Sequence, residues 1–242
     1  EQWNKPLAYC YVQRAVALAE KGMIKDALVL WGNHCQYTQA PFDAYDQYII
    51  WLILSENKVD IQKNLQQLSA QQLDKDYPEL AALLGLLALT KSPEIINDLP
   101  QESAFVAHFH LIQAGLQAYA NEDEEKLTGI LKQIPYRSAF RDLRSLLQAL
   151  LVLPSSERQT QALLAKISTG SAYANVARLL EITFLQGAAL FDALLRLNHS
   201  QRSIICHIKG FNKQQNEFLE HLTRQHEHLS DKVKFNMAIQ YQ

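Results

Sequence analysis

Hydrophobic side chains recur along this chain at spacings of three and four residues, and strict alternation of apolar and polar positions is nearly absent. In the segment 138–151, for example, Phe140, Leu143, Leu147 and Leu150 mark one continuous apolar stripe. Such a stripe is typical of an amphipathic helix that buries one face, whereas alternation indicates a strand. The pattern predicts an all-α protein.

A short phrase returns along the chain: a hydrophobic residue, a spacer of three residues, and then Ser-Ala-aromatic. Its serines are Ser103, Ser138 and Ser171. A serine hydroxyl in front of a helix can accept a hydrogen bond from a free backbone N–H of the first turn. We therefore expect each serine to be an N-cap, with the following aromatic ring wedged against the preceding helices. Aromatic residues that open helices in this way are expected at Phe42, Tyr77, Phe105, Phe140 and Tyr173.

These aromatic positions lie 35, 28, 35 and 33 residues apart, and a second apolar stripe fits between successive positions. Two helices in a period of about 34 residues are typical of an α-solenoid, in which helix hairpins stack in chain order. The sequence predicts about seven antiparallel helix hairpins plus a terminal helix, forming one domain over residues 1–242.

The first predicted hairpin resembles a tetratricopeptide repeat. In the segment 15–31, Gly22 falls at the turn between the helices, Ala27 at the small position where the helices touch, and Trp31 at the large position four residues later. The middle copies depart from this motif, because Arg144 or Leu147 stands where a small residue is expected. The resemblance implies a degenerate tetratricopeptide-like superhelix whose concave face binds a peptide or protein partner.

The C-terminal segment resembles the first helix of such a repeat. The residues that carry this likeness are Asn236, Met237, Ala238 and Tyr241. The helix expected over residues 231–242 has no second helix to cover its apolar face, and a solenoid end normally carries a polar closing element. We therefore expect a fragment of a longer protein, with self-association through this helix as an alternative.

The composition is that of a globular protein, with 48% hydrophobic residues, 20% charged residues and a net charge of −2 over 242 residues. No excess of basic residues is available to attract phosphate backbones, so no nucleic-acid partner is expected. The longest apolar run, residues 80–89, is half of the roughly 20 residues that a transmembrane helix needs. The compartment stays open: a cytoplasmic location is favoured, and a periplasmic one fits if a leader was removed.

The three cysteines, Cys10, Cys35 and Cys206, make an odd count and include no CxxC pair. This pattern argues against a disulfide framework and against a structural zinc site. If the first hairpin turns near Gly22, Cys10 and Cys35 lie about equally far from the turn and could pair. Buried free thiols are the preferred interpretation.

The histidines of the segment 220–229 suggest a metal site at first sight, but their spacing does not fit one. His221 and His228 are seven residues apart, and His226 and His228 are two apart, whereas helical zinc ligands are three or four apart. A solvated polar face is the better interpretation. Glycine-rich phosphate loops and a nucleophile–base pairing are also missing from the sequence. We therefore expect no metal, no cofactor and no catalytic residue.

Arg137, Arg141 and Arg144 follow one another at spacings of four and three, which suggests a basic stripe opposite the apolar one. Such a stripe could hold a carboxylate or a phosphate. The next copy carries Ala174 and Ala177 in the positions of Arg141 and Arg144, so a plain solvated face is preferred. Candidate partner-binding residues, taken from first-helix positions outside the apolar stripes, are Gln13, Tyr45, His108, Arg141, Arg144 and Arg178.

These observations predict a non-catalytic scaffold or adaptor that binds a peptide or protein partner on its concave face. The alternative from a different class is a helical-repeat domain that regulates or positions a larger enzyme or a transcriptional regulator.

Overall fold

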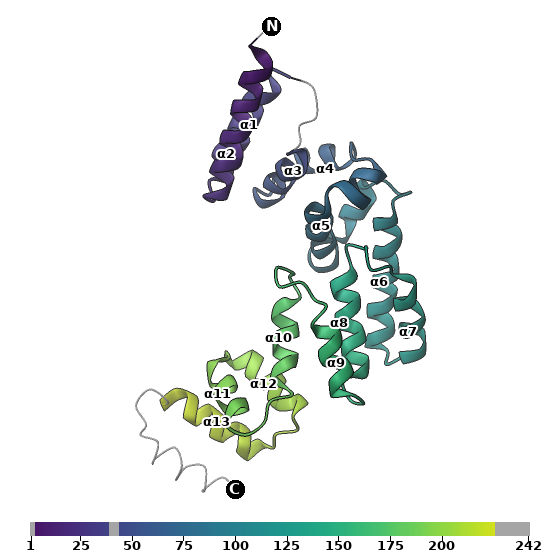
Figure 1. Ribbon diagram of the computed structural model, residues 1–242, viewed down its shortest axis with the longest axis vertical. Helices are drawn as coiled ribbons and strands as arrows, with labels where there is room; N and C mark the ends of the chain where they lie inside the picture. Colours follow the sequence, from purple (N-terminus) through teal and green to yellow (C-terminus); the bar gives the residue numbers. More distant parts are fainter. Residues whose placement is uncertain (1–2, 39–43, 226–242) are drawn as a thin grey trace. The chain divides into compact units, whose positions relative to one another are not determined.

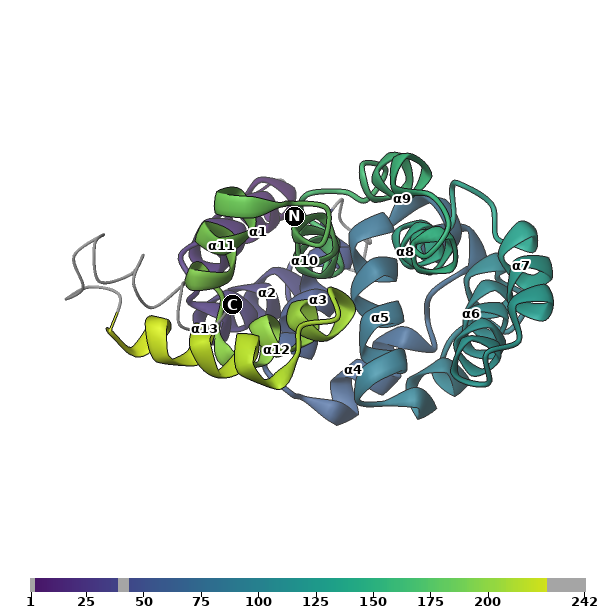
Figure 2. The same cartoon turned by 90° about the horizontal axis from the view of Figure 1, so that it is seen from below.

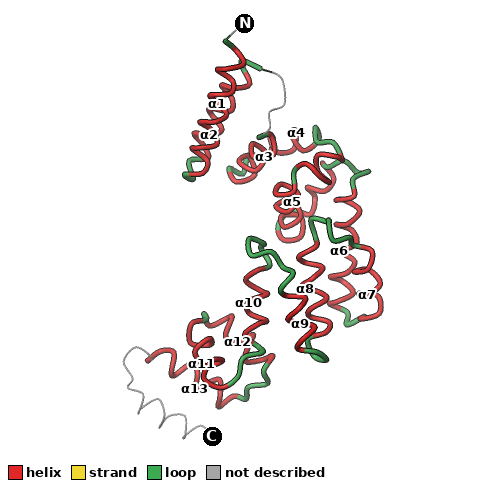
Figure 3. Tube along the Cα trace, in the orientation of Figure 1, coloured by secondary structure: helices red, strands yellow, loops and turns green. Residues whose placement is uncertain are grey.

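The computed structural model describes residues 3–38 and 44–225 of the chain. Within these ranges the backbone forms helices and no strand, which confirms the all-α prediction (Figure 1, Figure 3). The contacts within the chain divide it into two compact units, residues 1–144 and 145–242. The prediction of one continuous domain over residues 1–242 stays a prediction.

The first unit is a series of helices that pack mainly against their neighbours in the chain. Its elements are α1 (Asn4–Glu20), α2 (Ile24–Cys35), α3 (Tyr45–Leu54), α4 (Lys58–Leu65), η1 (Gln72–Asp76), α5 (Pro78–Thr90), η2 (Pro93–Asp98), α6 (Ala104–Ala120) and α7 (Glu124–Gln133). The next helix, α8 (Arg141–Val152), begins in the first unit and continues into the second. Figure 1 and Figure 2 both show α6 and α7 side by side, as expected for a helix hairpin.

The hairpin of α1 and α2 turns at Gly22, as the sequence predicts. Gly22 has a φ of 78°, which a glycine adopts without steric penalty. Its N–H donates to the Ala19 carbonyl, and the Met23 N–H donates to the Leu18 carbonyl, so the last carbonyls of α1 are satisfied by a Schellman-type turn. Ala27 is completely buried where α2 contacts α1, which confirms its predicted role as the small contact residue.

Trp31 connects this hairpin to α3. Its ring stacks on Tyr48 with 4.7 Å between centroids and meets Trp51 edge-on at 6.0 Å. His34, one turn further along α2, is buried and donates from Nδ1 to the Ala8 carbonyl at 3.2 Å. These contacts form an aromatic core in which an offset pair and a T-shaped pair both have favourable geometry.

Phe140 is the wedge that the repeated phrase predicts. It is buried, and its ring centroid lies 5.2 Å from Phe105 and 6.2 Å from Phe109 on α6. Its edge also touches the backbone of α5 at Gly85, where a Cβ would come within 2.8 Å of the ring. Phe140 therefore joins α5 and α6 to the start of α8. Tyr77 and Tyr173 also stand directly before helices, whereas Phe42 lies outside the described residues.

The capping role predicted for the three serines is confirmed at one of them. Ser103 is the N-cap of α6, and its Oγ accepts from the Val106 N–H at 3.3 Å. Ser138 and Ser171 were expected to do the same, but α8 and the helix α10 (Ala174–Ile182) each begin three residues after the serine. In both places the serine Oγ accepts from the N–H two residues further on, which closes a local turn instead.

The second unit contains the rest of α8, then α9 (Glu157–Leu164), α10, α11 (Gly187–Arg196), α12 (His199–Ile208) and α13 (Lys213–Gln225). Its core includes Leu190, Leu194, Ile205, Cys206 and Leu219. Arg202 ties three helices together, because its guanidinium donates to the Leu194 carbonyl and to the Thr223 hydroxyl. The helix predicted over residues 231–242 lies outside the described residues.

The cysteines are free, so the Cys10–Cys35 bond considered from the sequence is not formed. Cys206 is buried as expected, but Cys10 and Cys35 are exposed, so the expectation of buried thiols is wrong for these two. Among the described helices, none has both the length and the apolar character needed to cross a membrane.

Candidate binding pocket

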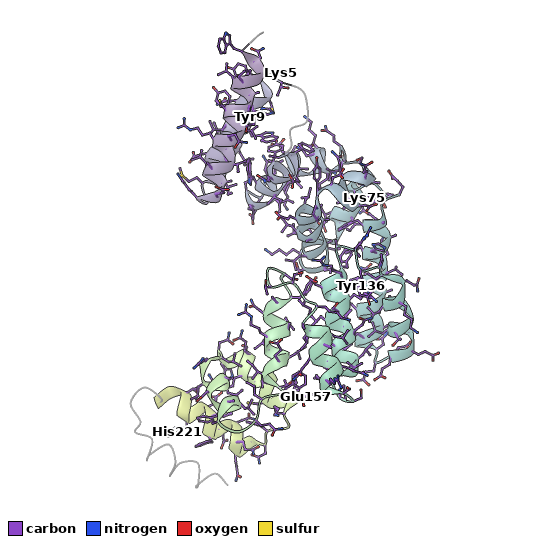
Figure 4. The ribbon with its side chains drawn as sticks, viewed as in Figure 1. Lys5, Tyr9, Lys75, Tyr136, Glu157 and His221 are labelled. Carbon is purple, nitrogen blue, oxygen red and sulfur yellow. The ribbon has the colours of Figure 1, made fainter. Side chains whose placement is uncertain are left out.

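A pocket of about 460 Å³ opens in the first unit, where η1, α5 and α6 meet the segment that leads into α8. Its lining comes from residues 73–82, 104–108 and 135–142, and we call it the η1 pocket. Figure 4 labels Lys75, a lining residue on η1, and Tyr136, which lies between the lining residues Pro135 and Arg137 before α8.

The first wall of the η1 pocket is η1 itself, one turn of π-helix. Leu73 anchors the turn in the core, and the Tyr77 N–H donates to the Gln72 carbonyl across five residues. Asp74 then joins η1 to the start of α6. Its two carboxylate oxygens accept from the N–H groups of Ala104 at 2.9 Å and Phe105 at 2.8 Å.

The Asp74 contact has a clear physical basis. The first N–H groups of a helix have no partner within the helix, and a negative charge is favoured beside them. Asp74 therefore satisfies two free donors of α6 and fixes η1 in place. Single π-helical turns often occur at functional sites, and this one shapes a pocket wall.

Four alanines give the pocket its space. Ala81 and Ala82 come from α5, Ala104 from α6, and Ala139 from the turn before α8. Ala104 and Ala139 are the alanines in two of the three copies of the Ser-Ala-aromatic phrase. Small side chains at these positions, next to Phe105, leave an apolar floor that a ligand's side chain can cover.

The pocket also carries charge. Asp142 is 8% exposed and pairs with Arg141, with 3.5 Å between Asp142 Oδ1 and Arg141 Nε. This distance is an ion-pair contact without hydrogen-bond geometry, and Oδ1 accepts no hydrogen bond from the described residues. Lys75 and Arg137 line the pocket as exposed side chains. Neither has a hydrogen bond or an ion pair within residues 3–38 and 44–225.

His108 on α6 is a half-buried lining residue. Burial lowers the pKa of its imidazole below the ordinary value, and the nearby Asp74 carboxylate opposes this change as the smaller influence. The ring is therefore neutral at pH 7 and can both donate and accept a hydrogen bond.

Of the six candidate residues from the sequence, the structure brings His108 and Arg141 together at this pocket. Arg178, on α10 in the second unit, lines a separate pocket of about 220 Å³. Gln13 is exposed on α1. Tyr45 is half-buried on α3, and its hydroxyl donates to Asn64 Oδ1 at 2.8 Å.

Arg144 does not belong to an exposed basic stripe, so that interpretation is wrong. It is 8% exposed, its Nε donates to the Leu131 carbonyl at 2.9 Å, and its guanidinium lies 4.4 Å from the centre of the Tyr136 ring. Arg137 lies before the first turn of α8, so it does not share a helical face with Arg141. Arg144 therefore holds the end of α7 against α8 rather than facing solvent.

The described residues contain no group of three His, Cys, Asp or Glu side chains that could hold a metal ion. His221 is exposed on α13, whereas His226 and His228 lie outside the described residues. At the η1 pocket, Ser138 Oγ is engaged by the Phe140 N–H, and Asp74 is engaged by α6. What the lining offers is apolar surface, a neutral imidazole and cationic donors, which suits recognition of a ligand.

Comparison with protein-family models, with curated proteins and with solved structures finds no match to this chain.

Proposed function

We propose that this chain is a non-catalytic, tetratricopeptide-like α-solenoid module that binds a polypeptide partner at the η1 pocket. Support for the solenoid comes from consecutive helix pairs, such as α1 with α2 and α6 with α7, that pack against each other. Support for the tetratricopeptide likeness comes from Gly22, Ala27 and Trp31, which occupy the turn, contact and core positions that the motif implies.

The main support for the proposal is that one pocket combines exposed alanine side chains with two cationic side chains that have no partner among the described residues. Ala82 and Ala104 are exposed, so apolar surface there is open to solvent and can be covered by a partner. Lys75 and Arg137 have no partner within the described part of the chain and can donate to one.

A polypeptide fits this lining because it supplies apolar side chains, carbonyl acceptors and N–H donors together. Sites for small ligands are about 300–1,000 Å³, and this pocket is near the lower end of that range. It is large enough to hold one or two side chains, while the rest of the partner lies on the surface outside. This arrangement is that of an anchor residue seated in a pocket.

A selection of displayed random peptides on the purified chain tests the proposal. Selected peptides should bind the wild-type chain and lose at least tenfold in affinity for Ala82→Trp, since the indole fills the exposed floor of the pocket. The matched control is Ala107→Trp, which adds the same ring at an exposed position of α6 that does not line the pocket. Equal affinity of all three proteins for every selected peptide would rule out the η1 pocket as the binding site.

A further inference from the structure

We propose that the partner segment held by the η1 pocket carries an acidic side chain beside an apolar one, with the carboxylate bound by Lys75 and Arg137. This inference rests on the proposed function and specifies the chemistry of the ligand.

Three charged side chains of the lining, Asp74, Arg141 and Asp142, are already engaged within the first unit. Both oxygens of Asp74 accept from backbone N–H groups at the start of α6. Arg141 and Asp142 are paired with each other, with Arg141 Nε 3.5 Å from Asp142 Oδ1. These three side chains have their charge compensated within the first unit, so they give the pocket little preference for a charged ligand.

The charges that remain are both positive. Lys75 comes from η1 and Arg137 from the turn before α8, so two elements distant in sequence supply cations to one pocket. Both side chains are exposed, and among the described residues neither has a carboxylate partner. Like charges on one pocket favour a ligand of the opposite sign, and a guanidinium can bind a carboxylate through two parallel hydrogen bonds.

The rest of the lining specifies the neighbour of the acidic group. Ala82 and Ala104 expose an apolar floor beside the buried ring of Phe105. Covering this floor with an apolar side chain removes hydrocarbon surface from water on both partners. A carboxylate alone would leave the floor exposed, and an apolar residue alone would leave the two cations unused.

A basic partner segment is disfavoured by the same geometry. Its cation would approach Lys75 and Arg137, and the one buried carboxylate on the lining, Asp142, is already in contact with Arg141.

Three synthetic peptides test the inference: acetyl-Ser-Leu-Glu-Leu-Ser-amide and its analogues with Gln or Lys in place of Glu. Each is titrated into the ¹⁵N-labelled chain, and the dissociation constant is read from amide chemical shifts. The Glu peptide should bind about tenfold more tightly than the Gln peptide, the effect of about 1.4 kcal/mol. The Lys peptide should bind most weakly of the three.

Arg137→Gln and Lys75→Gln should each reduce the preference for Glu over Gln severalfold. The control, Lys132→Gln, changes an exposed lysine of α7 outside the pocket and should leave the preference unchanged. Equal binding of the Glu and Gln peptides, tighter binding of the Lys peptide, or binding of none of the three would overturn the inference. The proposed function is decided separately, by whether peptides selected from the random library lose affinity for Ala82→Trp.

Discussion

Replacing Gly85 by alanine tests how tightly the ring of Phe140 is packed against α5. In an exposed helix this change stabilises a protein by about 1 kcal/mol, because alanine restricts the unfolded backbone more than glycine does. At Gly85, however, the new Cβ would lie 2.8 Å from Phe140 Cε1 and 3.2 Å from Cζ. Ordinary contacts begin near 3.4 Å, so the ring or the helix has to move.

The ring has little room to move. Phe140 is 2% exposed and is held from the other side by Phe105 and Phe109. Forcing an additional carbon into a packed core costs about 1–3 kcal/mol. Subtracting the gain from helix propensity, we expect Gly85→Ala to destabilise the first unit by about 0–2 kcal/mol.

The chain provides a matched control in Gly129→Ala. Gly129 lies on α7, is exposed, and has no neighbouring atom within 4 Å of the added Cβ. This variant should therefore be stabilised by about 0.5–1 kcal/mol. Because the gain from replacing glycine is common to both variants, they should differ by the packing cost alone, about 1–3 kcal/mol.

Urea unfolding followed by tryptophan fluorescence measures this difference through a signal that comes from the first unit. All three tryptophans, Trp3, Trp31 and Trp51, belong to residues 1–144. A double-mutant cycle with Phe140→Leu completes the test. Leucine lacks the ring edge that the new Cβ meets, so Gly85→Ala should no longer destabilise the protein in the Phe140→Leu background. Equal stabilisation by Gly85→Ala and Gly129→Ala would refute the packing of Phe140 on α5.

Three further predictions concern single residues of the first unit, each followed by tryptophan fluorescence in urea. Asp74→Ala leaves the Ala104 and Phe105 N–H groups without their acceptor and should cost about 1–2 kcal/mol, whereas the exposed neighbour Asp76→Ala should stay within about 0.5 kcal/mol. Arg144→Glu buries a carboxylate against the Leu131 carbonyl and should cost more than about 2 kcal/mol, so an unchanged stability would contradict its burial. Burial lowers the pKa of His34 in the folded state, with its bond to Ala8 acting in the opposite direction. Neutral His34 therefore contributes its full stability above the ordinary histidine pKa, and this contribution is lost as the pH falls below that pKa. Between about pH 7 and pH 5, the wild type should lose more free energy of unfolding than His34→Gln.

Local features of the sequence predicted local features of the fold. Gly22 marks its turn because few other residues adopt a positive φ without strain, and Ala27 marks its helix contact because only a small side chain fits there. Phe140 was recognisable as a wedge from its place in a phrase that recurs at a regular interval. Each of these signals is contained in a few adjacent residues.

The pocket depends on contacts that adjacent residues do not reveal. Asp74 caps a helix that begins 30 residues later, and η1 adopts a π-helical turn that no spacing rule separates from an α-helix. The prediction of an exposed basic stripe is wrong for a related reason. A stripe of Arg137, Arg141 and Arg144 requires a helix from Ser138, but the helix begins at Arg141, and Arg144 is turned toward the end of α7.

The most direct test of partner binding at the η1 pocket is to map where a library-selected peptide binds on the ¹⁵N-labelled chain. We expect the largest amide shift changes on residues 73–82, 104–108 and 135–142, and we expect Ala82→Trp to abolish them. Shift changes concentrated elsewhere, for example on α1 or in the second unit, would contradict the assignment of the η1 pocket as the partner-binding site.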